Sequence, residues 1–126
     1  EGGLATGLLE LAVAASVGLR IERAAIPVLP ECQAMCQALG LDPLGVIASG
    51  ALLLTCSPQE ANRLTAAWKA QDIAGCIIGE VTPPETGLTL LEAAGAGPLP
   101  RFARDEVARL FDEHAELDRP PSLCVS

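Results

Sequence analysis

The chain has 126 residues, 50% of them hydrophobic, which suffices for one domain with a buried core. Aromatic residues make up only 2% and the formal net charge is −8, so the chain offers neither the stacking rings nor the positive charge that nucleic acids require. Charges and prolines interrupt every apolar run well before the roughly 20 residues that cross a bilayer. We therefore predict no nucleic-acid partner and no membrane anchor.

The chain has five cysteines, an odd number, and enough apolar residues to form a core without disulfide bonds. Cys32 and Cys36 would share one helix face and have the spacing to seat a metal, but no second ligand pair or nearby histidine follows them. We predict free thiols, no metal site, and a reducing, cytoplasmic location.

The first half of the chain predicts three helices and one strand. Apolar residues at helical spacing indicate a helix over 4–16, and strict alternation over 19–22 indicates a half-buried strand. A proline start and a glycine stop predict a helix over 31–39, and Asp42-Pro43 repeats the start signal for a short helix over 43–48.

The second half begins with an apolar run at 51–56 that is typical of a central strand covered on both faces. Ser57 and Glu60 form a capping box that predicts a helix reaching residue 71. Three further segments complete the assignment: strands at 74–81 and 88–92, which we expect to pair as antiparallel neighbours across a turn at 83–87, and a charged helix at 104–116 after a linker at 93–100.

This order predicts an α/β (α+β) fold, in which a βαββ unit and the strand at 19–22 form a mixed sheet with helices against it.

Three segments, in order, resemble the carboxy-terminal domain of the aminoimidazole ribonucleotide (AIR) synthetase superfamily. The first is Glu1-Gly2-Gly3-Leu4-Ala5-Thr6-Gly7-Leu8, similar to the loop and helix that open that domain. The second is Ala38-Leu39-Gly40-Leu41-Asp42-Pro43-Leu44, and the third is Ile77-Ile78-Gly79-Glu80-Val81. Among the superfamily, the hydrogenase maturation dehydratase-like members are the most similar.

The resemblance implies a three-layer α/β/α domain over 1–117, a flexible tail over 118–126, and an amino-terminal ATP-binding domain that these residues do not include. It implies ATP and Mg²⁺ in the full-length protein, with neither expected on this fragment, which should be inactive alone. It also implies a homodimer and a maturation partner protein. The implied reaction is ATP-dependent phosphorylation of an amide or carboxamide oxygen.

The diglycine is the candidate phosphate site. Glycine lets the backbone approach an anion closely, and free amides at a helix start attract negative charge, so Gly2, Gly3, Leu4 and Thr6 are the predicted phosphate-binding residues. The alternative is a tight entry turn packed against the sheet.

Cys124 lies in the proline-containing tail, where it would serve as a carrier thiol or be an ordinary exposed cysteine. No nucleophile and base stand at a recognisable spacing, so the sequence names no catalytic residue.

Two other functions remain open from the residues alone. Sheets with a βαββ unit also occur in non-enzymatic modules that bind small molecules. Helix faces rich in Ala and Leu would equally suit a dimerisation module.

Overall fold

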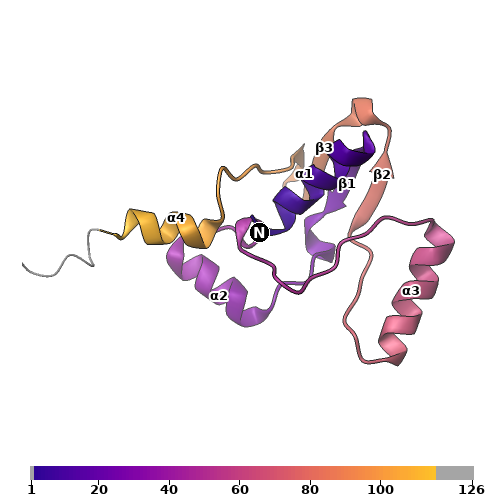
Figure 1. Ribbon diagram of the computed structural model, residues 1–126, viewed down its shortest axis with the longest axis horizontal. Helices are drawn as coiled ribbons and strands as arrows, with labels where there is room; N and C mark the ends of the chain where they lie inside the picture. Colours follow the sequence, from indigo (N-terminus) through magenta and orange to yellow (C-terminus); the bar gives the residue numbers. More distant parts are fainter. Residues whose placement is uncertain (1, 116–126) are drawn as a thin grey trace, which may run out of the picture.

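The computed structural model describes residues 2–115. At its centre lies a four-stranded mixed sheet in the order β2-β1-β3-β4 (Figure 1). The strands are β1 (Gly18–Glu22), β2 (Gly79–Thr82), β3 (Leu88–Glu92) and β4 (Gly95–Pro98). β1 runs antiparallel to β2 and parallel to β3, and β3 runs antiparallel to β4.

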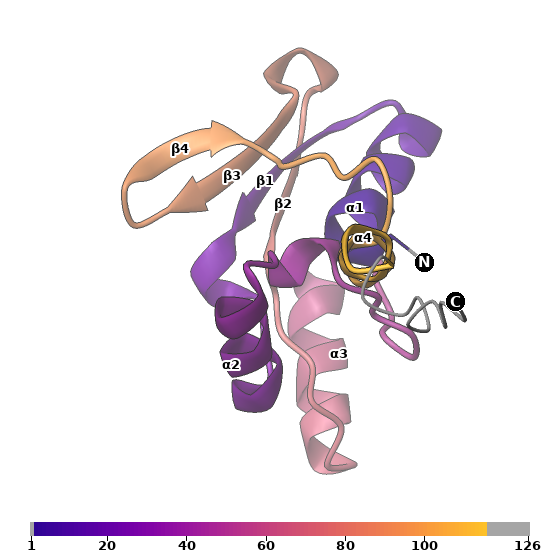
Figure 2. The same ribbon diagram turned by 90° about the vertical axis from the view of Figure 1, so that its left-hand side faces the viewer.

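The helices are α1 (Gly3–Ala15), α2 (Pro30–Leu39), α3 (Pro58–Ala70) and α4 (Glu106–Glu113). Three short 3-10 helices connect them, η1 (Arg23–Ala25), η2 (Pro43–Gly45) and η3 (Pro84–Thr86). α1 lies beside the sheet, whereas α3 projects away from it on two extended connections (Figures 1 and 2).

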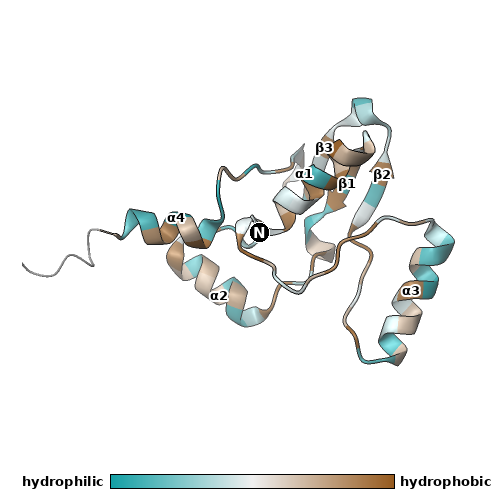
Figure 3. Cartoon of the chain, in the orientation of Figure 1, coloured by the Kyte–Doolittle hydropathy of each residue, from teal (hydrophilic) through white to brown (hydrophobic). Residues whose placement is uncertain are grey.

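The core is aliphatic and lies between α1 and one face of the sheet. α1 turns Ala5, Leu8 and Ala12 inward at helical spacing. The strands meet it with Leu19, Ile21 and Leu90, and Ile21 pairs directly with Leu90 across the parallel β1–β3 ladder. Burying each large aliphatic side chain contributes about 1.5–3 kcal/mol. In Figure 3, hydrophobic residues colour parts of α1 and of the adjacent strands brown.

The opposite face of the sheet is open. Arg20 and Glu22 alternate with the buried residues of β1 and are exposed, and Arg20 pairs with Glu80 of β2 at 2.5 Å. Of the α-helices described, α1 is the one that packs on the sheet, so the expected third layer is not formed within residues 2–115.

The mixed sheet with helices, and hence the α+β class, is confirmed. The βαββ unit is wrong, because residues 51–56 form no strand and Leu52 is 76% exposed. The expected pairing of β2 with β3 is also wrong. β1 lies between them, and its Leu19 amide donates to the Gly87 carbonyl at the end of the turn that joins β2 to β3.

Helix starts agree best with the sequence. The Ser57 hydroxyl accepts a hydrogen bond from the Glu60 amide at 3.3 Å, which confirms that the predicted cap opens α3. The helix expected over 43–48 is a single 3-10 turn, η2, and the linker expected over 93–100 contains the strand β4.

Candidate functional site

The diglycine opens α1 in a conformation that other residues rarely adopt. Gly2 and Gly3 have φ values of 78° and 76°, both left-handed. Gly3 is buried, and a Cβ placed on it would lie 2.5 Å from the Leu44 carbonyl oxygen and 2.7 Å from the Gly45 carbonyl carbon. Gly3 therefore packs tightly against η2, rather than against the sheet.

The amides at this helix start have no side-chain cap. Gly2 occupies the cap position without a capping side chain, and the first turn of α1 carries no acidic residue. The first N–H groups of a helix have no partner within the helix, so they attract an anion or water. Gly2, Leu4 and Thr6 are half-buried, and a Cβ on Gly2 would lie 2.9 Å from Thr6 Oγ1. The four predicted phosphate-binding residues thus lie together at the start of α1.

η2 holds the buried side of this turn. Asp42 Oδ1 accepts a hydrogen bond from the Leu44 amide at 2.9 Å, which fixes the start of η2. Arg23 Nη2 donates to the same Oδ1 at 2.8 Å and so joins η2 to the segment after β1. The sequence identified Asp42 as a cap but gave no sign of its arginine partner.

Glu106, at the start of α4, is a buried carboxylate with 7% of its surface exposed. Its Oε2 accepts hydrogen bonds from Arg109 Nη2 at 2.7 Å and from the Asp42 amide at 3.4 Å, and Arg109 Nε donates to Oε1 at 3.1 Å. The bonds from Arg109 are the main cause that lowers the pKa of Glu106, outweighing burial.

Sequence reasoning missed this residue, because a glutamate on a charged helix is ordinarily exposed. Its only sequence signal is its place directly after Asp105, whose side chain caps α4 through the Val107 amide.

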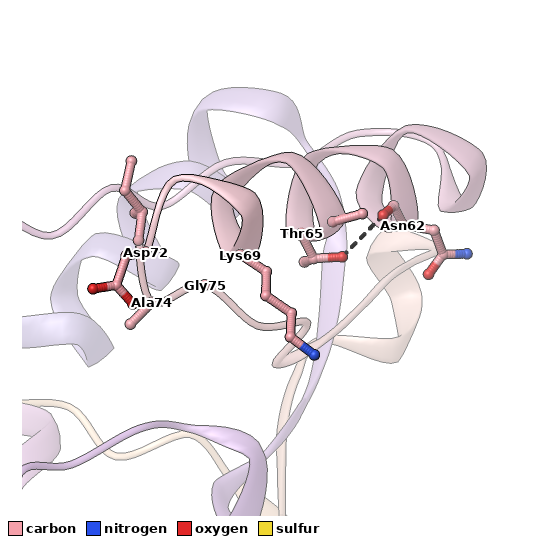
Figure 4. Close-up of a pocket in the computed structure, with 8 residues that line it drawn as sticks. Asn62, Thr65, Lys69, Asp72, Ala74 and Gly75 are labelled. Carbon is pink, nitrogen blue, oxygen red and sulfur yellow. Dashed lines mark hydrogen bonds between the residues drawn. The ribbon is translucent and has the colours of Figure 1, made fainter.

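Two hollows on the surface lie away from the diglycine. The larger, of about 530 Å³, is open and is lined by α3 and the turn that follows it, including Asn62, Lys69 and Asp72 (Figure 4). The smaller, of about 240 Å³, lies on the open face of the sheet around Arg20 and Glu80. None of the predicted phosphate-binding residues lines either hollow.

The structure describes four free thiols, Cys32, Cys36, Cys56 and Cys76. Cys32 and Cys36 face each other on α2, with 4.0 Å between their Sγ atoms, and burial raises the pKa of the Cys36 thiol. Within residues 2–115, no three His, Cys, Asp or Glu side chains converge as metal ligands. Cys124 lies outside the described residues.

Among the helices described, none has both the length and the apolar character needed to cross a bilayer.

A mixed sheet with one helix-covered face, a diglycine helix start and an Asp-Pro turn packed against it define an α+β domain. Residues 1–90 match the family model described as AIR synthase related protein, C-terminal domain. The chain belongs to this family.

The curated relatives include carbamoyl dehydratases named HypE. The one from Cupriavidus necator is 44% identical over 73 residues, covering 58% of this chain and 21% of its own length. The one from Rhodobacter capsulatus is 36% identical over 99 residues, covering 77% of this chain and 29% of its own length. The chain thus spans between a fifth and a third of these relatives.

Solved structures agree in fold. The crystal structure of Escherichia coli HypE, a hydrogenase maturation protein, superposes with a TM-score of 0.76 at 27% identity over 87% of this chain and 35% of its own. The structure of HypE in complex with ATP superposes with a TM-score of 0.72 at 27% identity, over 83% of this chain and 34% of its own. A chain of a HypE–HypF complex superposes with a TM-score of 0.71 at 24% identity, over 80% of this chain and 34% of its own.

Proposed function

We propose that this chain is the carboxy-terminal domain of an ATP-dependent enzyme that phosphorylates a carboxamide oxygen. The proposal is supported by relatives named carbamoyl dehydratase and by a solved structure of HypE in complex with ATP. In the overall reaction a carboxamide and ATP yield a nitrile, ADP and inorganic phosphate. The γ-phosphoryl group leaves the bridging oxygen, which stays with ADP, and forms a bond to the amide oxygen. That oxygen then leaves with the phosphate when the C–O bond breaks, and the amide nitrogen gives up its two protons, one to the phosphate and one to solvent.

The start of α1 is the observation that carries this proposal. Gly2 and Gly3 adopt left-handed conformations, no side chain caps the helix, and no carboxylate of the first turn competes for the amides. Such amides favour negative charge through hydrogen bonding and the helix dipole together, each contribution being about 1 kcal/mol. We assign the Gly3 and Leu4 amides, with the Thr6 hydroxyl, to a phosphate oxygen of ATP or of the phosphorylated amide.

We assign the ATP and Mg²⁺ sites mainly to a separate amino-terminal domain. The phosphate contact fits the residues described, since the amides of α1 have no capping side chain. A Mg²⁺ site does not fit them, because it needs oxygen ligands that converge, and residues 2–115 bring no three acidic, cysteine or histidine side chains together. When bound, ATP supplies the phosphoryl group. This domain then helps to enclose the phosphorylated amide, and alone it is inactive.

The organisation of the whole protein is part of the proposal. Residues 1–117 form the domain and 118–126 a tail, where Cys124 would carry the carboxamide on its sulfur. We further propose a homodimer and a maturation partner, the latter supported by the HypE–HypF complex among proteins of this fold. A cytoplasmic location is supported by the free thiols of Cys32, Cys36, Cys56 and Cys76.

Oxygen tracing tests the proposed reaction. A carboxamide labelled with ¹⁸O in its carbonyl is incubated with ATP and the longest natural form of the protein, and the released phosphate is analysed by mass spectrometry. The label should move into inorganic phosphate in step with ADP. Label that stays in the organic product, or ADP formed without any loss of the carboxamide, would contradict the proposal. A metabolite that binds without ATP turnover would favour a non-enzymatic module.

A further inference from the structure

One short turn, η2, separates the buried carboxylate of Glu106 on α4 from the diglycine. α4 lies beyond residues 1–90, the part of the chain that matches the family model. Its first residue, Glu106, nevertheless contacts η2, which lies within the matched part.

The contact between α4 and η2 is both polar and steric. Glu106 Oε2 accepts from the Asp42 amide at 3.4 Å, and two bonds from Arg109 hold the same carboxylate in place. A Cβ on Gly45 would lie 2.6 Å from Glu106 Cγ and 2.7 Å from Phe102 Cδ1, so the glutamate side chain and the phenyl ring both lie directly on the η2 backbone. η2 therefore cannot shift toward α4 without moving Glu106.

The contact between η2 and α1 is equally close. A Cβ on Gly3 would lie 2.5 Å from the Leu44 carbonyl oxygen and 2.9 Å from the Gly45 Cα. Packed protein interiors transmit such displacements, because they have little free volume to absorb them. The position of η2 thus sets the position of the Gly3 backbone.

We propose that Glu106 is a positioning residue, which holds the Gly3 and Leu4 amides in the direction needed for phosphate through the Asp42–Gly45 turn. This inference rests on the proposed function for its ligand. The relay itself is geometric: Glu106 fixes η2, and η2 fixes the first turn of α1. Replacing Glu106 would therefore change a site that its side chain does not touch.

The test uses the 126-residue chain labelled with ¹⁵N. Glu106→Asp keeps the charge and the Arg109 pairing but withdraws the carboxylate from the Asp42 amide by one methylene. Glu106→Gln keeps the reach but loses the charge. Glu80→Gln is the matched control, since Glu80 also pairs with an arginine but lies on the open face of the sheet. Amide resonances are recorded with and without inorganic phosphate.

Glu106→Asp should move the Gly3 and Leu4 resonances and weaken phosphate binding about fivefold, the effect of one misdirected hydrogen bond. Glu106→Gln should move these resonances less and weaken phosphate binding less. Glu80→Gln should have neither effect. Should the Asp42 and Leu44 resonances move in Glu106→Asp while those of Gly3 and Leu4 stay in place, the relay is overturned. If phosphate leaves these amides unmoved in the wild-type chain, the phosphate contact fails, and the shifts in Glu106→Asp still decide the relay.

Discussion

Arg23 and Asp42 form a two-pronged ion pair, with Nη2–Oδ1 and Nη1–Oδ2 distances of 2.8 Å and 3.5 Å. The guanidinium also reaches Glu92, at the end of β3, at 3.4 Å. One side chain thus joins the segment after β1 to η2 and to the neighbouring strand. Both partners are about one-third exposed, so solvent weakens the pair without removing it.

Arg23→Ala should lower the free energy of unfolding by about 1 kcal/mol, because a guanidinium that bridges two carboxylates stabilises the fold more than an ordinary surface ion pair does. Urea denaturation measures the change. Arg63→Ala is the control, since Arg63 pairs with Glu60 one turn away and its side chain is 82% exposed, and this substitution should cost less than about 0.5 kcal/mol. An equal loss of unfolding free energy in the two variants would show that bridging two carboxylates adds no stability.

Acid should destabilise the fold through Glu106. Its pKa is lowered from 4.5 in the folded chain, so below that pH the unfolded chain binds a proton that the folded chain does not. The stabilisation from Glu106 is complete above the unfolded pKa and is lost as the pH falls through the folded one. Urea denaturation between about pH 6 and pH 3 follows this loss.

Two variants identify the group responsible for the acid effect. Glu106→Gln should remove this part of the pH dependence. Arg109→Gln should move the loss to higher pH, because the bonds that lower the pKa of Glu106 are gone. An unchanged pH profile in both variants would assign the acid effect to other carboxylates.

Gly3→Ala should destabilise the domain by about 3 kcal/mol, since a Cβ would add a backbone clash to a left-handed φ. Gly40→Ala separates the two costs. Gly40 has a φ of 66° with nothing within 4 Å of the position that a Cβ would occupy, so it should lose only about 1 kcal/mol. Thermal unfolding of both variants measures the difference, and equal losses would refute the close approach of Gly3 to η2.

Ser57→Ala should destabilise α3 by about 1 kcal/mol through the lost cap on the Glu60 amide. Because α3 projects from the sheet, the effect should be local (Figure 1). Hydrogen exchange should speed up in the α3 amides while those of β1 stay protected. Ser49→Ala, outside any helix, is the control. Faster exchange throughout the sheet would mean that α3 and the sheet unfold together.

Local signals in the sequence predicted local structure well. The α1, β1 and α2 bounds differ from expectation by one residue, and the Ser57 cap is where the pattern placed it. These features depend on neighbouring residues, namely helical spacing, alternation and caps, and therefore need no knowledge of tertiary contacts.

Apart from the helix expected over 43–48, which is a single 3-10 turn, the main errors concern distant pairing. Residues 51–56 have the composition of a strand, but a strand also needs a neighbouring strand to pair with, and composition does not determine that. β4 was missed for the converse reason: Gly95–Pro98 has no strand signal, and its pairing comes from β3, where Leu90 lies opposite Gly97. Glu106 belongs to the same class, because its burial depends on Asp42, 64 residues earlier in the chain.

The parallel ladder between β1 and β3 has a kinetic consequence. β1 ends at Glu22 and β3 starts at Leu88, so the central pair of the sheet closes only after the chain between them has been made. Closing so long a loop costs entropy before any contact is gained, which slows folding. During synthesis, α1, β1 and η2 therefore precede by more than 40 residues the strand that completes their core, and β1 lacks its parallel neighbour until Glu92 has been made.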